Sequence, residues 1–210
     1  MECADFNNKI LPPNPFGAQA HIKVLLASNS PRRRELLGLI VPGFTIAQSR
    51  EVDESYPSDL AAAEVPAFIS KKKAAAYADL LCPDEMVITA DTVVILGDKI
   101  LGKPKDYDDA CHMLADLAGR EHTVVTGVTL TTVNAAKTFS ESTKVEFAPL
   151  SREEIEEYVR IYRPFDKAGA YGIQEWIGAA AIKRIDGCFY NVMGLPLHRL
   201  YAELRSFAGK

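Results

Sequence analysis

The residues with the clearest capacity for chemistry lie between Ser28 and Arg33, where an expected strand gives way to a helix. Ser30 is a suitable helix N-cap and Pro31 fits the first helical position, so free backbone amides and the positive end of the helix dipole face the preceding loop. The guanidinium groups of Arg32 and Arg33, with the hydroxyls of Ser28 and Ser30, can donate hydrogen bonds to an anion there. The segment therefore predicts a phosphate-binding site.

A solvated helix surface is the alternative for the same three arginines, with Leu36 and Leu37 facing the core. Three consecutive helical residues fan out over more than half a turn, so they are not expected to face one ligand together. We expect Arg34 to be the residue without a ligand role.

Asp91 is the strongest single candidate for catalysis. It lies inside an apolar, β-branched run of strand length that continues to Leu96, and we expect it to interrupt a buried strand. A carboxylate buried in a strand is costly unless it meets a metal, a cation or hydrogen-bond donors. The alternative is a structural aspartate that binds neighbouring backbone amides.

Three carboxylates, Glu51, Asp53 and Glu54, lie in a polar loop upstream of Asp91. Carboxylates are hard oxygen ligands of the kind that magnesium prefers, so this loop could complete a metal site with Asp91. A solvated loop is the alternative.

Two groups of lysines could add positive charge. Lys71, Lys72 and Lys73 lie in an expected helix, from which Lys72 or Lys73 could reach inward to a phosphate. Lys103 precedes a proline that restricts its backbone and limits where its ammonium group points. For both groups, a surface position is the alternative.

The segment 166–174 joins two glycines, an aspartate–lysine pair and the side-chain amide of Gln174. An amide both donates and accepts hydrogen bonds, so Gln174 could recognise the edge of a nucleobase. Alternatively, Asp166 and Lys167 pair with each other and the glycines serve turns.

Composition limits the kind of protein. The net charge of −4 argues against a broad nucleic-acid surface, which needs many phosphate contacts from a basic face. The four cysteines and four histidines show no metal-ligand spacing, and the cysteines fit reduced, inert thiols.

Residues 1–20 lack the pattern of a secretory signal and are expected to form a flexible extension before one domain spanning 21–210. The apolar runs are too short to cross a bilayer, so we expect a soluble, cytoplasmic protein without a membrane partner.

Apolar periodicity, caps and turns predict a curved mixed β-sheet flanked by helices, an α/β fold with its glycine-marked loops around a cleft. The expected strands are 22–27, 44–47, 86–96 and the antiparallel pair 123–133 and 138–147, followed by a hairpin over 179–193 that turns at Asp186 and Gly187. The expected helices are 31–40, 65–81, 106–117, 151–161 and 196–207.

Five segments, taken in order, resemble the Maf family of nucleoside triphosphate pyrophosphatases. They are LASNSPRR at 26–33, TADTVV at 89–94, GKP at 102–104, DKAGAYGIQ at 166–174 and VMGLP at 192–196. The resemblance implies a mixed α/β fold similar to that of inosine triphosphatases, with a nucleotide cleft between two lobes.

The resemblance also implies residue roles. Asp91 matches the catalytic carboxylate, and Glu54 matches an acidic position near a divalent cation, magnesium or manganese and alternatively cobalt. Thr92 and Gln174 match positions linked to substrate choice. The phosphate-contacting positions are matched by Ser28, Arg32, Arg33, Lys73 and Lys103.

The motif forms are similar to the branch that hydrolyses dTTP and UTP, and this implies a house-cleaning enzyme acting on those nucleotides or on modified pyrimidine nucleotides. The 7-methyl-GTP branch, which is the alternative enzyme, usually has an aromatic residue in place of Arg32 and a glutamine in place of Thr92. A non-catalytic nucleotide-binding regulator of cell division is the alternative from another class. The nucleotide is the expected partner, together with a homodimeric second copy.

Overall fold

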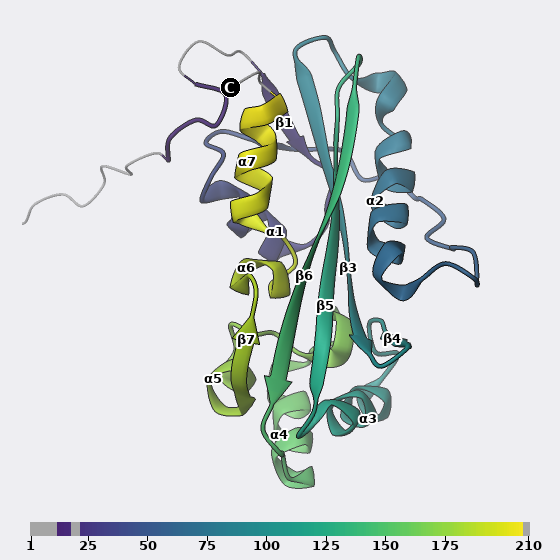
Figure 1. Ribbon diagram of the computed structural model, residues 1–210, viewed down its shortest axis with the longest axis vertical. Coiled ribbons are helices and arrows are strands. Elements are labelled where there is room, and N and C mark those ends of the chain that lie inside the picture. The colour runs from purple at the N-terminus through teal and green to yellow at the C-terminus, as the bar shows by residue number, and fades with distance from the viewer. Residues whose placement is uncertain (1–11, 18–21, 208–210) are drawn as a thin grey trace, which may run out of the picture.

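Three long antiparallel strands, β3 (Glu85–Leu96), β5 (Glu121–Thr131) and β6 (Ala136–Phe147), run through most of the length of the molecule in the computed structural model (Figure 1). The structure describes residues 12–17 and 22–207. The long strands are rich in valine and threonine, whose branched side chains pack well on a pleated surface. The predicted pair 123–133 and 138–147 is therefore confirmed.

The sheet is mixed, as predicted. Its strand order is β2-β1-β3-β5-β6-β7, with β4 also paired to β3. Strand β1 lies parallel to β2 and β3, and the remaining pairs are antiparallel. The shorter strands are β1 (Lys23–Leu26), β2 (Thr45–Ile46), β4 (Lys99–Leu101) and β7 (Ile182–Asp186).

One edge of β3 is left open at its middle. Strand β1 pairs with residues 85–88 of β3, and β4 pairs with residues 94–96 on the same side. Between them, residues 89–93 have no strand partner on that edge in the described part of the chain. Asp91 lies at the centre of this opening.

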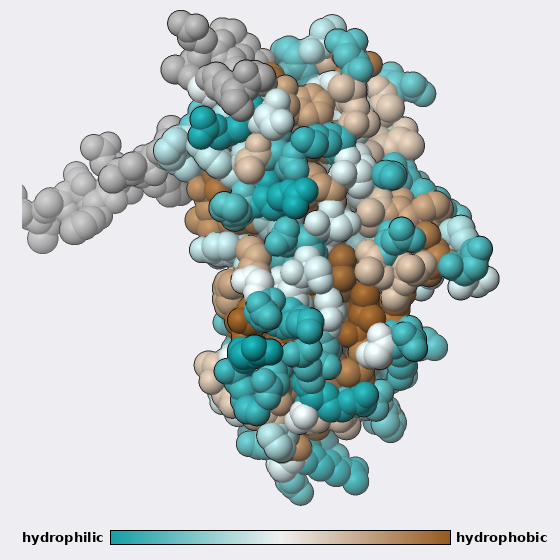
Figure 2. All heavy atoms as spheres, in the orientation of Figure 1, coloured by the Kyte–Doolittle hydropathy of each residue, from teal (hydrophilic) through white to brown (hydrophobic). Residues whose placement is uncertain are grey.

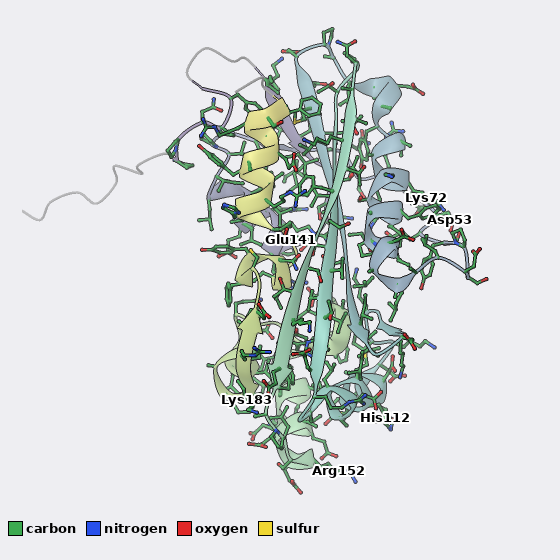
Figure 3. All side chains as sticks on the ribbon, viewed as in Figure 1. Asp53, Lys72, His112, Glu141, Arg152 and Lys183 are labelled. Carbon is green, nitrogen blue, oxygen red and sulfur yellow. The ribbon has the colours of Figure 1, made fainter. Side chains whose placement is uncertain are left out.

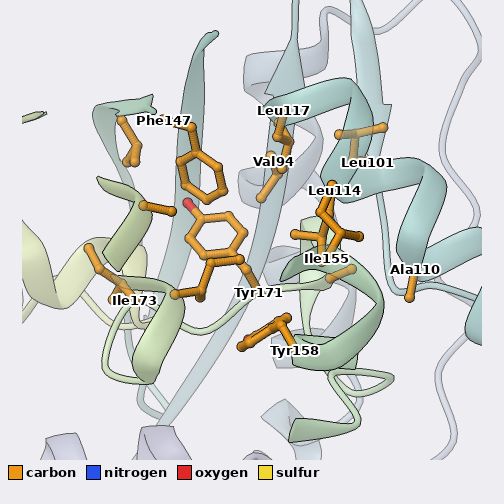
Figure 4. Close-up of a cluster of buried hydrophobic side chains, with 14 of the residues drawn as sticks. Val94, Leu101, Ala110, Leu114, Leu117, Phe147, Ile155, Tyr158, Tyr171 and Ile173 are labelled. Atoms are coloured by element: carbon orange, nitrogen blue, oxygen red, sulfur yellow. The ribbon is translucent and has the colours of Figure 1, made fainter. Parts of the chain in front are cut away.

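Two hydrophobic clusters occupy opposite ends of β3, which contributes Met86 and Ile88 to one and Val94 and Leu96 to the other. The first is completed by α1 (Pro31–Gly38) and α7 (Leu197–Phe207). The second, drawn in Figure 4, is completed by α3 (Tyr107–Leu117), α4 (Arg152–Tyr162) and α5 (Trp176–Ala181). The molecule therefore has two lobes on one sheet.

Helix α2 (Val65–Ala75) packs against β3 and β5, on the opposite side of the sheet from α1 and α7 (Figure 1). Its close approach depends on Gly127 of β5. A Cβ atom at Gly127 would lie 2.3 Å from the backbone nitrogen of Ala67. The absence of a side chain at Gly127 thus lets the backbone of α2 touch the sheet.

Helix starts were predicted well because caps are local. Ser30 and Asp106 accept hydrogen bonds from the backbone as N-caps of α1 and α3. Ser151 and Glu154 form the expected capping box of α4.

The expected hairpin over 179–193 is wrong. Helix α5 ends at Ala181, β7 pairs instead with β6, and α6 (Phe189–Val192) follows the turn. The side-chain amide of Asn191 donates to Thr143 Oγ1 and to the carbonyl of Val124, so long-range contacts hold this segment helical.

One further boundary differs from expectation. The helix predicted over 65–81 ends at Ala75, because Tyr77 turns inward and donates to the carbonyl of Gln48; the short helix η2 (Ala78–Leu80) follows. Asp91 interrupts the buried run of β3 as predicted, since Asp91 and Thr92 are only half-buried between buried residues, while the strand itself continues through them. The other short helices are η1 (Ala62–Glu64) and η3 (Ala168–Ala170).

The expected extension 1–20 is only partly described. Residues 12–17 depart from that expectation, because Phe16 is buried with Leu36 and Leu204 in the cluster under α7. Residues 1–11 and 18–20 lie outside the described residues. Within the described ranges, no helix has the length and apolarity needed to cross a membrane.

The candidate active site

A cleft of about 670 Å³ lies between the two lobes at the open edge of β3. Its lining brings together residues that are up to 167 positions apart in the sequence, from Ala27 to Gly194. All nine predicted site residues line it: Ser28, Arg32, Arg33, Glu54, Lys73, Asp91, Thr92, Lys103 and Gln174.

Asp91 and Glu54 share one ammonium group. The Nζ atom of Lys73, on α2, lies 2.8 Å from Asp91 Oδ1 and 3.0 Å from Glu54 Oε1. The side chains of Lys73 and Asp91 are mostly buried, whereas that of Glu54 is exposed. The Lys73 cation therefore compensates the buried carboxylate that the sequence singled out.

The helix start has the predicted geometry. The Ser30 hydroxyl accepts the backbone N–H of Arg33, and the Ser28 hydroxyl accepts the backbone N–H of Ser30. Pro31 occupies the first position of α1. This end of α1 faces the cleft, with Ser28 and Arg32 in its lining.

Arg32 and Arg33 have different surroundings. Arg32 reaches across the cleft to Asp166, with 2.7 Å between Nη1 and Oδ2. Burial raises the pKa of Asp166, but hydrogen bonds from Arg32 and Lys167 outweigh it and leave that pKa below its usual value. Arg34 is exposed and lies outside the cleft lining.

Arg33 is bound by the protein on each of its three guanidinium nitrogens. They donate to the carbonyls of Gly194 and Ala90 at 2.8 Å and to Thr92 Oγ1 at 2.9 Å. Burial lowers the pKa of Arg33. Arg33 thus joins α1 to the open edge of β3 and leaves two N–H groups for a ligand.

Thr92 lies on the opposite face of β3 from Asp91, because successive strand residues alternate. Its hydroxyl contacts that of Thr126 at 2.9 Å, and Thr126 donates to the carbonyl of Asn191. Thr92 therefore connects Arg33 to β5 and to α6.

Lys73 is the member of the lysine run that enters the cleft. Lys71 is exposed, and Lys72 pairs with Asp53 at 3.1 Å on the outer side of α2, where Figure 3 labels both. Lys103 lines the cleft from the other lobe, and its ammonium group has no carboxylate partner within 12–17 and 22–207.

Gln174 is exposed at the cleft and makes no side-chain hydrogen bond to the described part of the protein. The neighbouring residues are bound: Lys167 pairs with Asp166, as the sequence suggested, and also with Glu175. The amide of Gln174 is thus available to a ligand.

The family model for Maf-like protein matches residues 23–207, nearly all of the described domain. The chain belongs to the Maf family. Among curated Maf relatives, the dTTP/UTP pyrophosphatase of Phocaeicola vulgatus is 52% identical over 87% of this chain and 95% of its own length. The dTTP/UTP pyrophosphatase of Porphyromonas gingivalis strain W83 is 49% identical over 88% of this chain and 94% of its own.

Similarity to solved structures is weaker. The Ham1 protein of Staphylococcus aureus aligns with 60% of this Maf chain and 72% of its own, at 16% identity and a TM-score of 0.46.

The donor set of the Maf cleft fits a hard divalent cation bound together with a substrate. Glu54 and Asp91 supply two carboxylates, each within 3.0 Å of the Lys73 cation, so both already face one positive charge. Magnesium is usually held by one or two carboxylates, with water and substrate phosphates completing its shell. In the described residues, no group of three or more acidic, histidine or cysteine ligands gathers.

Sequence reasoning missed several residues of the Maf cleft. Arg50, Tyr56 and Lys167 line it. Arg50 lies with its guanidinium carbon 5.7 Å from the centre of the Tyr77 ring. A lone arginine in a polar loop gives no sequence signal that it lines a cleft. The pairing of Asp166 with Arg32 was missed as well, because the two residues are 134 positions apart in the sequence.

Proposed function

We propose that this Maf chain hydrolyses dTTP and UTP, or modified pyrimidine nucleotides, to the monophosphate and pyrophosphate, as a house-cleaning enzyme. The observation that carries this proposal is the Asp91 carboxylate, set against Lys73 in a cleft edged by a helix start and cationic side chains. Relatives about half identical to the chain and named dTTP/UTP pyrophosphatase support the choice of substrate.

Asp91 acts as the general base in this proposal. Its Oδ1 accepts from Lys73, while Oδ2 accepts no hydrogen bond from the described residues. Oδ2 can therefore receive a proton from a water that attacks the α-phosphorus. The bond to the β-phosphate then breaks, and pyrophosphate leaves.

The cationic groups stabilise the charge that builds on the phosphates during this attack. Arg32, Lys73 and Lys103 approach the cleft from both lobes, and the α1 start adds backbone amides. Fixed positive groups of this kind supply most of the catalysis in phosphoryl transfer. Arg32 exchanges Asp166 for a phosphate when the nucleotide binds.

Glu54 and Asp91 hold a divalent cation in this proposal, magnesium or manganese. A cation bound there would neutralise phosphate charge and orient the triphosphate. Lys73 lies between the two carboxylates, and a cation bound to them would leave its ammonium group for the phosphates.

The nucleobase lies toward the second lobe, where Gln174 presents its amide to the pyrimidine edge. Thr92 acts on substrate choice through Arg33, to which it is hydrogen-bonded. The proposed setting is the cytoplasm, which holds the nucleotide pool. The homodimer remains a prediction that sedimentation velocity would test.

The test is pyrophosphate release from dTTP, UTP, CTP, 7-methyl-GTP and the purine nucleotides, each with magnesium or manganese. We expect dTTP and UTP to be cleaved fastest, and chelation of the metal to stop the reaction. Preference for 7-methyl-GTP would replace this proposal with the alternative enzyme. Binding of dTTP without turnover would favour the non-catalytic regulator.

A further inference from the structure

The loop that carries Gln174 is anchored from behind by Tyr158 of α4. The Tyr158 hydroxyl donates to a Glu175 carboxylate oxygen and accepts the backbone N–H of Gly172 at 3.1 Å. Only 1% of Tyr158 is exposed, so both hydrogen bonds are shielded from water. The residues on both sides of Gln174 are therefore tied to one phenol.

Glu175 is held at both of its oxygens. Oε2 receives the Tyr158 hydrogen bond, and Oε1 lies 3.0 Å from the ammonium group of buried Lys167. The carboxylate also lies against Gly172, where a Cβ atom would be 2.8 Å from Glu175 Cδ. The absence of a side chain at Gly172 thus leaves room for the Glu175 carboxylate.

The same anchor extends to the phosphate end of the cleft. Lys167 contacts Asp166 Oδ1 at 3.0 Å, and Asp166 Oδ2 contacts Arg32 at 2.7 Å. A continuous polar chain therefore connects the start of α1 with the loop around Gln174. Tyr158 and Glu175 themselves lie outside the cleft lining.

We propose that Tyr158 and Glu175 are positioning residues for nucleobase selection: they fix the backbone on both sides of Gln174 without touching the nucleotide. This inference rests on the proposed function, in which Gln174 contacts the base. Since the exposed side chain of Gln174 makes no hydrogen bond to the described residues, its position relative to the cleft depends on the backbone that carries it. Loosening that backbone weakens base selection and leaves phosphate binding intact.

The test uses Tyr158→Phe, which keeps the ring and removes both hydrogen bonds. Tyr162→Phe is the matched control, because Tyr162 stacks on Tyr158 at 4.9 Å between ring centres and its hydroxyl has no partner among the described residues. Calorimetry with magnesium measures the Kd of three probes: the α,β-methylene analogues of dTTP and CTP, and inorganic tripolyphosphate. Thermal unfolding defines a temperature at which every variant is folded.

We expect Tyr158→Phe to raise the Kd of the dTTP analogue by about tenfold, which is the scale of one or two buried hydrogen bonds. The Kd of Tyr158→Phe for tripolyphosphate stays within about twofold of the wild-type value. For Tyr162→Phe, the Kd of each of the three probes stays within the same range. The preference for the dTTP analogue over the CTP analogue falls. In a Gln174→Ala background, Tyr158→Phe changes that preference no further.

Equal weakening of tripolyphosphate would overturn the inference, because a general structural defect affects both ends of the cleft. The inference would also be overturned if Tyr158→Phe kept the wild-type preference for the dTTP analogue over the CTP analogue, or if the wild type itself showed no such preference. A further outcome separates this inference from the proposed pyrophosphatase activity. If the wild type prefers the dTTP analogue and Tyr158→Phe reduces that preference, but dTTP releases no pyrophosphate, only the proposed function is contradicted.

Discussion

At the scale of single residues, the cleft is organised by cations that already have protein partners. Lys73 is shared by Glu54 and Asp91, and Arg32 is paired with Asp166. Such pairs keep the charged groups oriented, and they leave few unpaired charges in the cleft. In the proposed function, a triphosphate that enters the cleft replaces these carboxylates as the partner of both cations, so its binding depends on its own high charge.

The first prediction concerns Asp91→Asn. The amide keeps the shape of the side chain but cannot accept the proton from water, so pyrophosphate release from dTTP should fall by at least about a thousandfold. Binding of the α,β-methylene dTTP analogue should change by less than about tenfold. A variant with near wild-type turnover would remove Asp91 as the base.

The second prediction concerns Arg33→Lys. One ammonium group cannot reproduce the three nitrogen positions that bind Gly194, Ala90 and Thr92, so buried acceptors lose partners. We expect the free energy of unfolding in urea to fall by about 2 kcal/mol. Arg34→Lys, at an exposed position of the same helix, is the control and should stay within about 0.5 kcal/mol of wild type.

At the scale of elements, the site depends on where strands stop pairing. Strands β1 and β4 cover the two ends of one edge of β3, and the uncovered middle holds Asp91. Helix α2 brings Lys73 to that point from one face, and α1 brings Arg33 to Thr92 on the other. The open middle of β3 therefore receives a cationic side chain from each face of the sheet.

Gly127 of β5 controls how closely α2 approaches the sheet. In Gly127→Ala the new methyl group would meet the backbone of α2 at Pro66 and Ala67, so the helix must move away from the sheet. We expect a loss of about 1–3 kcal/mol in the free energy of unfolding, with reduced turnover as Lys73 shifts from Asp91.

Gly38→Ala is the control for Gly127→Ala. A Cβ atom there would lie 3.8 Å from the Phe44 ring, an ordinary contact, so its stability and turnover should remain near those of wild type. Equal effects of the two substitutions would contradict the proposed packing role of Gly127.

Sequence patterns predicted the elements whose signals are local. The Ser30 cap, the Ser151–Glu154 box and the β-branched strands all formed as expected. The segment after Gly178 did not, because β7 takes β6 as its partner and Asn191 binds Thr143, 48 residues away. Most cleft residues were candidates from their own types and spacing, and the family resemblance chose between the alternatives and added Thr92. The anchor at Tyr158 depends on contacts that no local pattern indicates.

At the scale of the whole molecule, the two lobes have separate cores joined by the long strands. Figure 2 shows hydrophilic residues over both lobes, with hydrophobic residues among them on the same face. His122 packs against Phe147 and Tyr171 of the second cluster. It contacts the Tyr171 hydroxyl at 2.8 Å and is 2% exposed. Tyr171 lies next to Gly172, so this pair connects the core with the cleft. Burial lowers the pKa of His122 to about 4.

This low pKa predicts how stability depends on pH. Between pH 6.5 and pH 4, the unfolded chain binds a proton at His122 that the folded chain does not bind. The free energy of unfolding therefore decreases as the pH falls. The loss approaches about 3 kcal/mol at pH 4. Urea unfolding across this range should show the loss in wild type and a smaller one in His122→Gln; equal slopes would contradict the assignment.

In the proposed function, Asp91 directs water to the α-phosphorus, so the new oxygen must be found on that phosphorus. The wild-type protein hydrolyses dTTP in ¹⁸O-labelled water with magnesium, and mass spectrometry locates the label. We expect one ¹⁸O atom in the thymidine monophosphate and none in the pyrophosphate. Label in pyrophosphate, or release of orthophosphate with thymidine diphosphate, would contradict attack at the α-phosphorus.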